Sequence, residues 1–267
     1  MAVRSPRSVS AAARPRLRLP WRDLLDVLAI GVWSAMLFRY WIGGKLLLLL
    51  HPDYAWLSNL AAIVLLLLAA FKGLKIWLGL LGRTKAAVSS KDQGHVTLLP
   101  ATISSALILS VAVFGLIYTP RAFASQTAIQ RGVSDSITLT RAQPRRFVRA
   151  AAPEERTIID WIRLINVYPE PDAYGGEAVA VSGFVIHPKE WSADHLMVSR
   201  FVLTCCAADA YPVGLPVQLP AGKTYPVDSW IEVTGQMTTE TLDGRRQLAI
   251  APTAIKVIEE PRNPYQY

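Results

Sequence analysis

Three long apolar stretches in the first half of the chain constrain its fold more than any other feature. They cover roughly residues 24–42, 54–81 and 96–118. At about 1.5 Å of rise per residue in a helix, each is long enough to cross a hydrocarbon core about 30 Å thick. No comparable stretch follows Pro120, where apolar and polar residues alternate between turn-forming residues. The sequence therefore predicts three transmembrane helices followed by a β domain held on one side of the membrane.

Charge is divided unevenly between the two parts of the chain, whose formal net charge is +8. Residues 1–149 carry 19 Lys and Arg against 5 Asp and Glu, whereas residues 150–267 carry 9 against 15. Basic residues next to membrane spans set their orientation. The acidic balance of the C-terminal part opposes binding to a phosphate backbone. We therefore expect the lipid bilayer as a partner and no nucleic acid.

The positive charges also predict an orientation in the membrane. Six arginines lie in the tail before the first span: Arg4, Arg7, Arg14, Arg16, Arg18 and Arg22. Arg83, Lys85 and Lys91 follow the second span. Because cytoplasmic loops are rich in Lys and Arg, both segments are expected inside the cell, and three crossings then place the C-terminal domain outside. Arginines between residues 121 and 149 weigh mildly against this orientation. We expect a multi-pass protein of the cell membrane with a cytoplasmic N-terminus.

The C-terminal part reads as a small β barrel behind a helix. Residues 154–168 place isoleucines at helical spacing, and Pro169 ends the pattern. Five strand-like segments follow: 177–187, 196–206, 211–219, 229–239 and 246–258. Asp243-Gly244 is a strong hairpin signal between the last two, and Gly183 lies near the middle of the first. These features predict an OB-like five-stranded barrel.

The predicted layout has four parts. Residues 1–23 form a basic cytoplasmic tail, and residues 24–118 form a three-span transmembrane region. Residues 119–153 form a polar connector, and residues 154–267 form the extracytoplasmic OB-like domain.

A histidine and a carboxylate lie between the first two spans. His51 and Asp53 flank Pro52 after a short leucine run. One interpretation is a hydrated turn at the membrane interface. The other is a polar pair that faces a transport path in a partner, because ionisable groups at membrane depth are often functional.

The two cysteines of the chain are adjacent, Cys205 and Cys206, at the end of the predicted second strand. Neighbours in a strand point to opposite faces, so we expect one thiol in the core and one in solvent. Three interpretations are open: a small buried residue, a soft metal or metalloid site that uses Asp209, His187 or His195, and a redox-labile vicinal disulfide. No pair of CxxC motifs is present to build a closed structural zinc site.

Signatures of catalysis are missing from the sequence. We find no phosphate-binding glycine loop, no HExxH and no GxSxG motif. We therefore expect no enzyme, no catalytic residues and no cofactor, except for a soft metal ion at Cys205 and Cys206.

Several short strings together resemble a known family. They are Gly44-Lys45, His51-Pro52-Asp53-Tyr54, Pro120, Gln130-Arg131-Gly132, Gly183-Phe184-Val185, Arg200-Phe201, Cys205-Cys206-Ala207-Ala208-Asp209-Ala210, and Trp-Ile-x-Val-x-Gly at residues 230–235. The chain is similar in these strings to the YcgQ-like family of proposed permease subunits, and the Cys-Cys-x-Ala-Asp-Ala string is the most specific of them.

The resemblance implies a partner, a separate polytopic permease similar to the arsenical-permease group, but no substrate. We therefore expect an accessory, non-channel subunit of a two-component membrane permease. The alternative is a membrane-anchored extracytoplasmic module that binds a soft metal or metalloid, or that senses thiol redox state.

Overall fold

The computed structural model describes residues 21–81, 100–133 and 152–267. These residues form two compact units. The helical unit contains the described residues of Met1–Arg39 and Asn59–Tyr118. The barrel unit contains those of Tyr40–Ser58 and Thr119–Tyr267. The segment that joins the first two long helices therefore belongs to the barrel unit.

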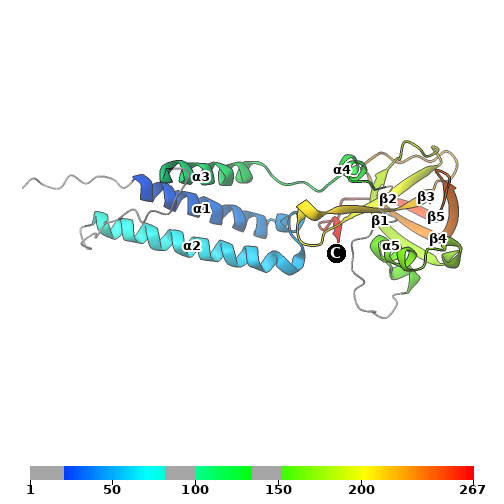
Figure 1. Cartoon of the computed structure of the whole chain (residues 1–267), viewed down its shortest axis with the longest axis horizontal. Helices are drawn as coiled ribbons and strands as arrows, with labels where there is room; N and C mark the ends of the chain where they lie inside the picture. Colours follow the sequence, from blue (N-terminus) through cyan, green and yellow to red (C-terminus); the bar gives the residue numbers. More distant parts are fainter. Residues whose placement is uncertain (1–20, 82–99, 134–151) are drawn as a thin grey trace, which may run out of the picture. The chain divides into compact units, whose positions relative to one another are not determined.

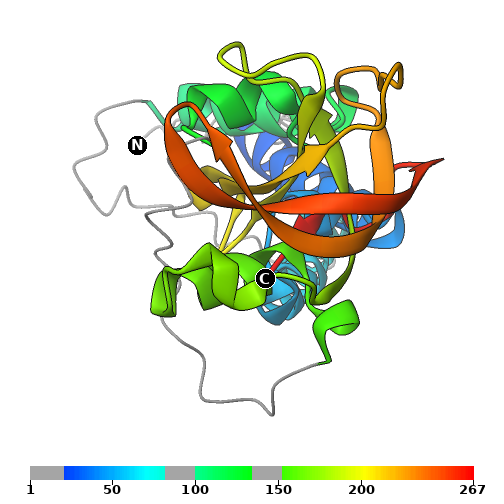
Figure 2. The same ribbon diagram turned by 90° about the vertical axis from the view of Figure 1, so that its right-hand side faces the viewer.

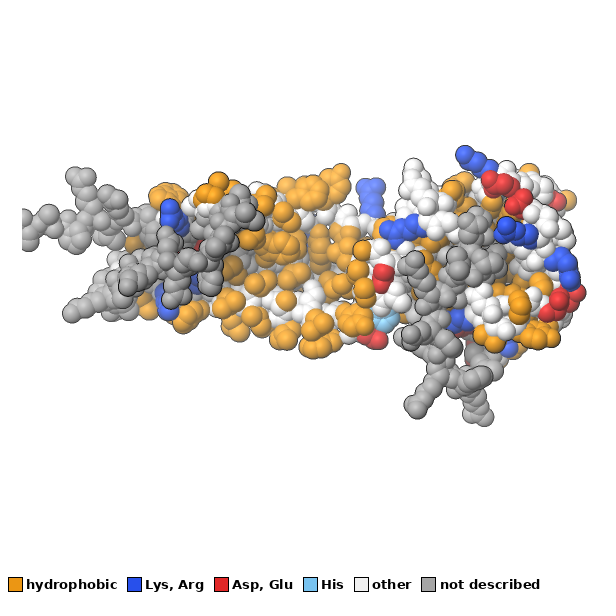
Figure 3. Space-filling model, in the orientation of Figure 1, with side chains coloured by type: hydrophobic (Ala, Val, Ile, Leu, Met, Phe, Trp, Pro, Cys, Tyr) orange, Lys and Arg blue, Asp and Glu red, His pale blue; other side chains and the backbone are white. Residues whose placement is uncertain are grey.

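Three apolar helices form the helical unit (Figure 1): α1 (Trp21–Ile42), α2 (Pro52–Leu80) and α3 (Ala101–Ile117). Both α1 and α2 are long and apolar enough to cross a membrane. The helix α3 has 17 residues and is shorter, and the first residues of the expected third span lie outside the described part of the chain. Large apolar side chains cover the surface of this unit (Figure 3), among them Leu67, Phe71 and Phe114.

Side-chain hydrogen bonds join α1 to the other two helices. The hydroxyl of Ser34 on α1 donates to the carbonyl of Ala62 on α2 at 2.8 Å. The indole Nε1 of Trp33 donates to the carbonyl of Ile108 on α3 at 3.0 Å. Both bonds satisfy side-chain donors on a helix whose other side chains are mostly apolar. The helix α3 therefore packs as a member of this unit.

The barrel contains five strands: β1 (Ala178–Ile186), β2 (His195–Val202), β3 (Tyr211–Gln218), β4 (Trp230–Leu242) and β5 (Arg245–Ile258). Around the barrel the order is β1, β4, β5, β3 and β2, and β2 pairs with β1 to close the ring. Only β3 and β5 run parallel within this ring. The predicted five-stranded barrel is confirmed, and Figure 2 shows the long, curved β4–β5 pair.

Local sequence explains two features of the barrel. Asp243 and Gly244 both have positive φ, as the predicted two-residue hairpin requires. Gly183 in β1 faces the backbone of Ser199 in β2, which a Cβ atom at position 183 would strike. Glycine therefore allows β1 to lie against β2 where the ring closes.

The helix α5 (Ile158–Val167) covers the barrel core with Ile158, Trp161 and Ile162, all fully buried. It begins later than the helix predicted over residues 154–168, because Thr157 caps its N-terminus. A short 3-10 turn, η3 (Pro153–Glu155), precedes the cap. In this capping box Asp160 N donates to Thr157 Oγ1 at 3.3 Å, and Thr157 N donates to Asp160 Oδ2 at 3.0 Å.

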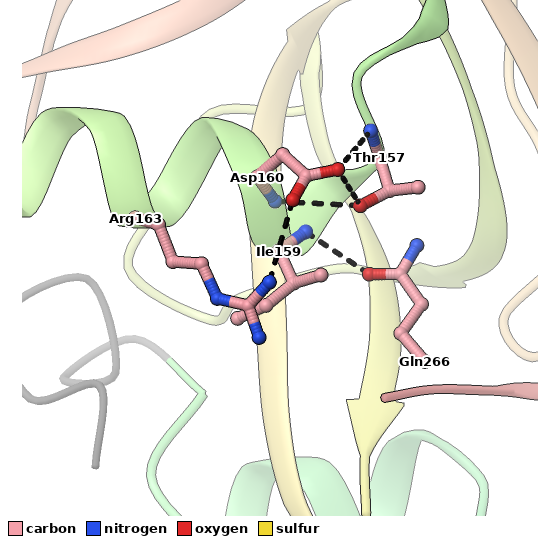
Figure 4. A network of polar contacts seen from close by, with 5 residues as sticks. All are labelled: Thr157, Ile159, Asp160, Arg163 and Gln266. Carbon is pink, nitrogen blue, oxygen red and sulfur yellow. Dashed lines mark hydrogen bonds and ion pairs between the residues drawn. The ribbon is translucent and has the colours of Figure 1, made fainter. Parts of the chain in front are cut away.

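The end of the chain is also bound to this helix start (Figure 4). Ile159 N donates to Gln266 Oε1 at 3.0 Å. Gln266 lies in β6 (Tyr265–Gln266), a short strand that runs parallel to β2. The C-terminal residues thus extend the sheet beyond the five-stranded ring.

A second apolar cluster lies outside the main barrel core. Phe184 and Phe201 stack with ring centroids 5.7 Å apart, and Ala128 of α4 (Ser125–Gln130) is buried in the same cluster. The segment 119–133, which the sequence predicts as part of a polar connector, therefore contributes to the barrel unit.

Candidate thiol–carboxylate site

Cys205 and Cys206 lie beyond the strand in which they were predicted. The strand β2 ends at Val202, and the two cysteines form a turn that leads into η5 (Ala207–Asp209), a single 3-10 turn. Cys205 is exposed and Cys206 is half-buried. The strand predicted over residues 196–206 is therefore confirmed as far as Val202, and the prediction that it continues through the cysteines with one thiol in the core is wrong.

The carboxylate of Asp209 explains why the strand stops. Cys205 N donates to Asp209 Oδ2 at 2.8 Å, and Cys206 N donates to Asp209 Oδ1 at 3.2 Å. A carboxylate that accepts two successive amide protons competes with the strand ladder for them, as Asp does in turns and caps. The chain therefore bends around Asp209.

This bend gathers three side chains that could act as metal ligands. The Cys205 and Cys206 Sγ atoms are 3.7 Å apart, and neither is in a disulfide. Ligand atoms of Cys205, Cys206 and Asp209 all lie within 4.8 Å of one another. Among the described residues, this is the group of three or more His, Cys, Asp or Glu side chains that is compact enough to hold a metal ion.

The thiol and the carboxylate perturb each other. The hydrogen bond to Asp209, followed by that to Cys206, raises the pKa of Cys205 to about 12. Burial raises the pKa of Asp209, but hydrogen bonds from Cys205, from Thr204 and from the two amides outweigh it and lower that pKa below its usual value. At neutral pH the pair therefore consists of a carboxylate and a neutral thiol. A neutral thiol is a weak nucleophile.

The segment before α2 pairs with the thiol turn. Leu50 and Cys206 form an isolated antiparallel bridge. On either side of it, His51 N donates to Cys205 O at 3.0 Å and Ala207 N donates to Leu49 O at 2.8 Å. The backbone of the turn is thus bound on one edge by residues 49–51, which follow η1 (Lys45–Leu48).

The structure therefore brings both predicted candidate sites into one region of the barrel unit. His51 is only 6% exposed, and its ring meets that of Tyr267 edge-on at 4.6 Å. Its Nδ1 accepts a hydrogen bond from Asp53 N at 3.1 Å, while the Asp53 side chain is 73% exposed. His51 Nδ1 thus accepts from an amide in the first turn of α2, and the His51 backbone lies beside the cysteine turn.

The other two histidines considered as ligands lie elsewhere. His187 Nε2 is 2.8 Å from the carbonyl oxygen of Tyr225. His195 Nδ1 is 3.2 Å from both Ser192 Oγ and Asp194 Oδ1. Neither is part of the compact group around Asp209.

Arg131 is a site residue to which sequence reasoning assigned no role. Its guanidinium donates to the carbonyl of Ala210, which follows the thiol turn, and lies 4.8 Å above the Phe123 ring. Three strings that carry the family resemblance, far apart in the sequence, therefore meet here: residues 51–54, 130–132 and 205–210. The resemblance marked each of these strings separately, but only the fold shows that they lie next to one another.

A separate polar group lies in the helical unit. Lys72 Nζ on α2 is 3.2 Å from Asp26 Oδ2 on α1, and the hydroxyl of Ser105 on α3 donates to the same carboxylate. Sequence reasoning assigned no role to Asp26, Lys72 or Ser105. Paired ionisable groups on apolar helices are the signal that could have found them.

The barrel unit is similar to a known protein family. Residues 155–267 match the family described as the DUF1980 C-terminal domain. The chain is also similar to the UPF0703 protein YcgQ of Bacillus subtilis (strain 168), with 25% identity over 104 residues. This alignment covers 38% of the present chain and 36% of the relative, so it spans little more than a third of either. The predicted resemblance to the YcgQ-like family is thus confirmed, with its match to the DUF1980 C-terminal domain over residues 155–267.

Proposed function

We propose that this protein is the accessory, non-channel subunit of a two-component membrane permease and presents its barrel outside the cell membrane. One observation carries the proposal: charged side chains are few along the apolar helices. Charged residues are absent from three stretches, 27–38, 54–71 and 101–117. Conduction paths for ions are lined with carbonyls or polar side chains. The translocation path therefore belongs to a partner, a polytopic permease.

In this proposal α3 completes a third crossing. Its 17 residues span about 26 Å at 1.5 Å per residue. Its bonds to α1 through Ser105 and Ile108 support a common environment for the two helices. An odd number of crossings separates the two termini, and the arginine-rich tail favours the cytoplasm for the N-terminus.

Co-purification with the permease tests this proposal. The full chain, tagged after Tyr267, is extracted in a mild detergent from cells that also produce a polytopic permease of the arsenical-permease group. We expect the two proteins in a fixed ratio through size-exclusion chromatography, and the same transport defect when either gene is deleted. A chain that elutes alone, together with normal transport in its absence, would contradict the proposal.

A further inference from the structure

The two thiols have the spacing that a single tetrahedral metal ion requires. Zinc–sulfur bonds of about 2.3 Å at a tetrahedral angle place two sulfur ligands about 3.8 Å apart. The Cys205 and Cys206 Sγ atoms are 3.7 Å apart. Both thiols can therefore bind one cation with little movement of their side chains.

The third ligand is held in place before a cation arrives. Both oxygens of Asp209 accept a backbone amide proton, at 2.8 and 3.2 Å. An ionised carboxylate has about four acceptor positions. The two amides and the Thr204 side chain occupy three of them, and the fourth, which accepts from the Cys205 thiol, becomes open to a cation when that thiol loses its proton. The same bonds fix the orientation of the carboxylate toward the thiols, as outer contacts do in metal sites.

The backbone that carries the ligands is fixed from outside the turn. His51 N donates to Cys205 O, Ala207 N donates to Leu49 O, and Arg131 donates to the carbonyl of Ala210. The turn therefore does not need to fold around the metal. A prearranged set of ligands lowers the entropy cost of binding.

We infer that Cys205, Cys206 and Asp209 form an open, three-ligand site for a thiophilic divalent d10 cation, Zn²⁺ or Cd²⁺. Thiolate sulfur selects such ions over Mg²⁺ and Ca²⁺. Binding releases the two thiol protons to solvent and forms two metal–sulfur bonds and one metal–oxygen bond. Water or an incoming ligand completes the coordination.

The exposure of Cys205 indicates an open metal site rather than a closed structural one. Structural zinc sites are closed by four protein ligands, whereas sites with three protein ligands keep an open position. Cys205 is exposed, so the cation remains accessible to solvent. The site therefore suits a cation that is taken up and released. This inference does not depend on the permease role, because a chain that binds the metal but no permease would leave it intact.

Titration of the full chain with Cd²⁺ tests the site. The protein is purified in detergent with a thiol-free reductant, and the ultraviolet absorption of cadmium–thiolate bonds is followed. We expect saturation at one equivalent, displacement by Zn²⁺, and two zinc–sulfur distances of about 2.3 Å by X-ray absorption spectroscopy. Saturation without cadmium–thiolate absorption would overturn the inference.

Matched variants assign the ligands. C205S and C206S should each weaken binding and lose about half of the absorption per bound cation, because one thiolate remains. The double variant C205S/C206S should lose all of it, and D209N should weaken binding roughly tenfold or more. The control is D243N, which changes a carboxylate in the β4–β5 hairpin and should bind Cd²⁺ as the unmodified chain does. Binding retained in the double variant C205S/C206S would overturn the inference.

A second measurement needs no variant and covers the case in which the serine variants fail to fold. Alkylation of both cysteines by a maleimide is followed in the unmodified chain with and without one equivalent of Zn²⁺. We expect the metal to slow alkylation of both thiols roughly tenfold or more, because metal-bound thiolates are protected. Equal rates would overturn the inference.

Discussion

The backbone amide of His51 donates to the carbonyl of Cys205 at 3.0 Å and binds the link between α1 and α2 to the thiol turn. Leu50 continues this pairing as a β bridge to Cys206. A change in the backbone of the turn therefore alters its hydrogen bonds with residues 49–51. Because Pro52 begins α2 directly after His51, the turn is connected through the chain to a helix that is long and apolar enough to cross a membrane.

The first prediction concerns the reactivity of Cys205. Its pKa of about 12 lies above the ordinary thiol value of 9.0 and is raised first by Asp209. The alkylation rate of Cys205 should therefore keep rising through pH 10, whereas an ordinary thiol would already be levelling off. D209N removes the negative charge and should speed alkylation at pH 8 by roughly tenfold, since each unit of pKa is about tenfold in thiolate. Iodoacetamide labelling followed by mass spectrometry measures both effects.

The control for this prediction is D243N, whose labelling rate should match that of the unmodified chain. Equal rates in D209N and the unmodified chain would show that the carboxylate does not suppress the thiol.

Gly183→Ala should destabilise the barrel. The added Cβ would strike the backbone of Ser199, and backbone cannot move aside as a flexible side chain can. We expect a loss of at least about 1–3 kcal/mol, the usual cost of overpacking. Tryptophan fluorescence during urea unfolding measures it, since Trp161 and Trp230 both lie in the barrel unit. Gly244→Asn is the control, because Asn tolerates the positive φ of that open turn. A G183A variant as stable as the unmodified chain would show that position 183 has room for a Cβ atom beside Ser199.

Thr157→Ala should weaken the start of α5. The substitution removes the oxygen that accepts from Asp160 N and should cost about 1 kcal/mol. Thr157→Ser keeps that oxygen and should retain most of the stability. The same urea unfolding experiment compares the two, and equal losses in both variants would argue against the cap.

The pair of Asp26 and Lys72 should show coupling in the helical unit. D26N or K72M alone leaves one charge without its partner, whereas the double variant removes both. We therefore expect each single variant to lower the melting temperature in detergent more than the double variant does. A double-mutant cycle quantifies the interaction, and additive losses would mean that the pair contributes nothing.

Much of the barrel could be predicted from the sequence because its signals are local. Alternation of apolar residues located the five strands, and Asp243-Gly244 located the β4–β5 hairpin. The position where β2 ends, Val202, could not be predicted from the alternation of apolar residues. Asp209 binds the amides of Cys205 and Cys206, and this competition with the strand ladder leaves no trace in the pattern of hydrophobicity.

The contacts of the candidate site could not be predicted, because they join distant parts of the chain. No periodicity relates Leu50 to Cys206, or Arg131 to Ala210. The resemblance identified these strings separately, and only the closed barrel unit shows them to be neighbours.

The proposed function requires a barrel held outside the membrane by an odd number of crossings, and a reporter fused after Tyr267 tests this most directly. Alkaline phosphatase, which is active only outside the cytoplasm, and green fluorescent protein, which under general export folds only inside it, are fused at the same position. The account predicts phosphatase activity without fluorescence. Fluorescence without phosphatase activity would place the barrel and its thiols in the cytoplasm and contradict the account.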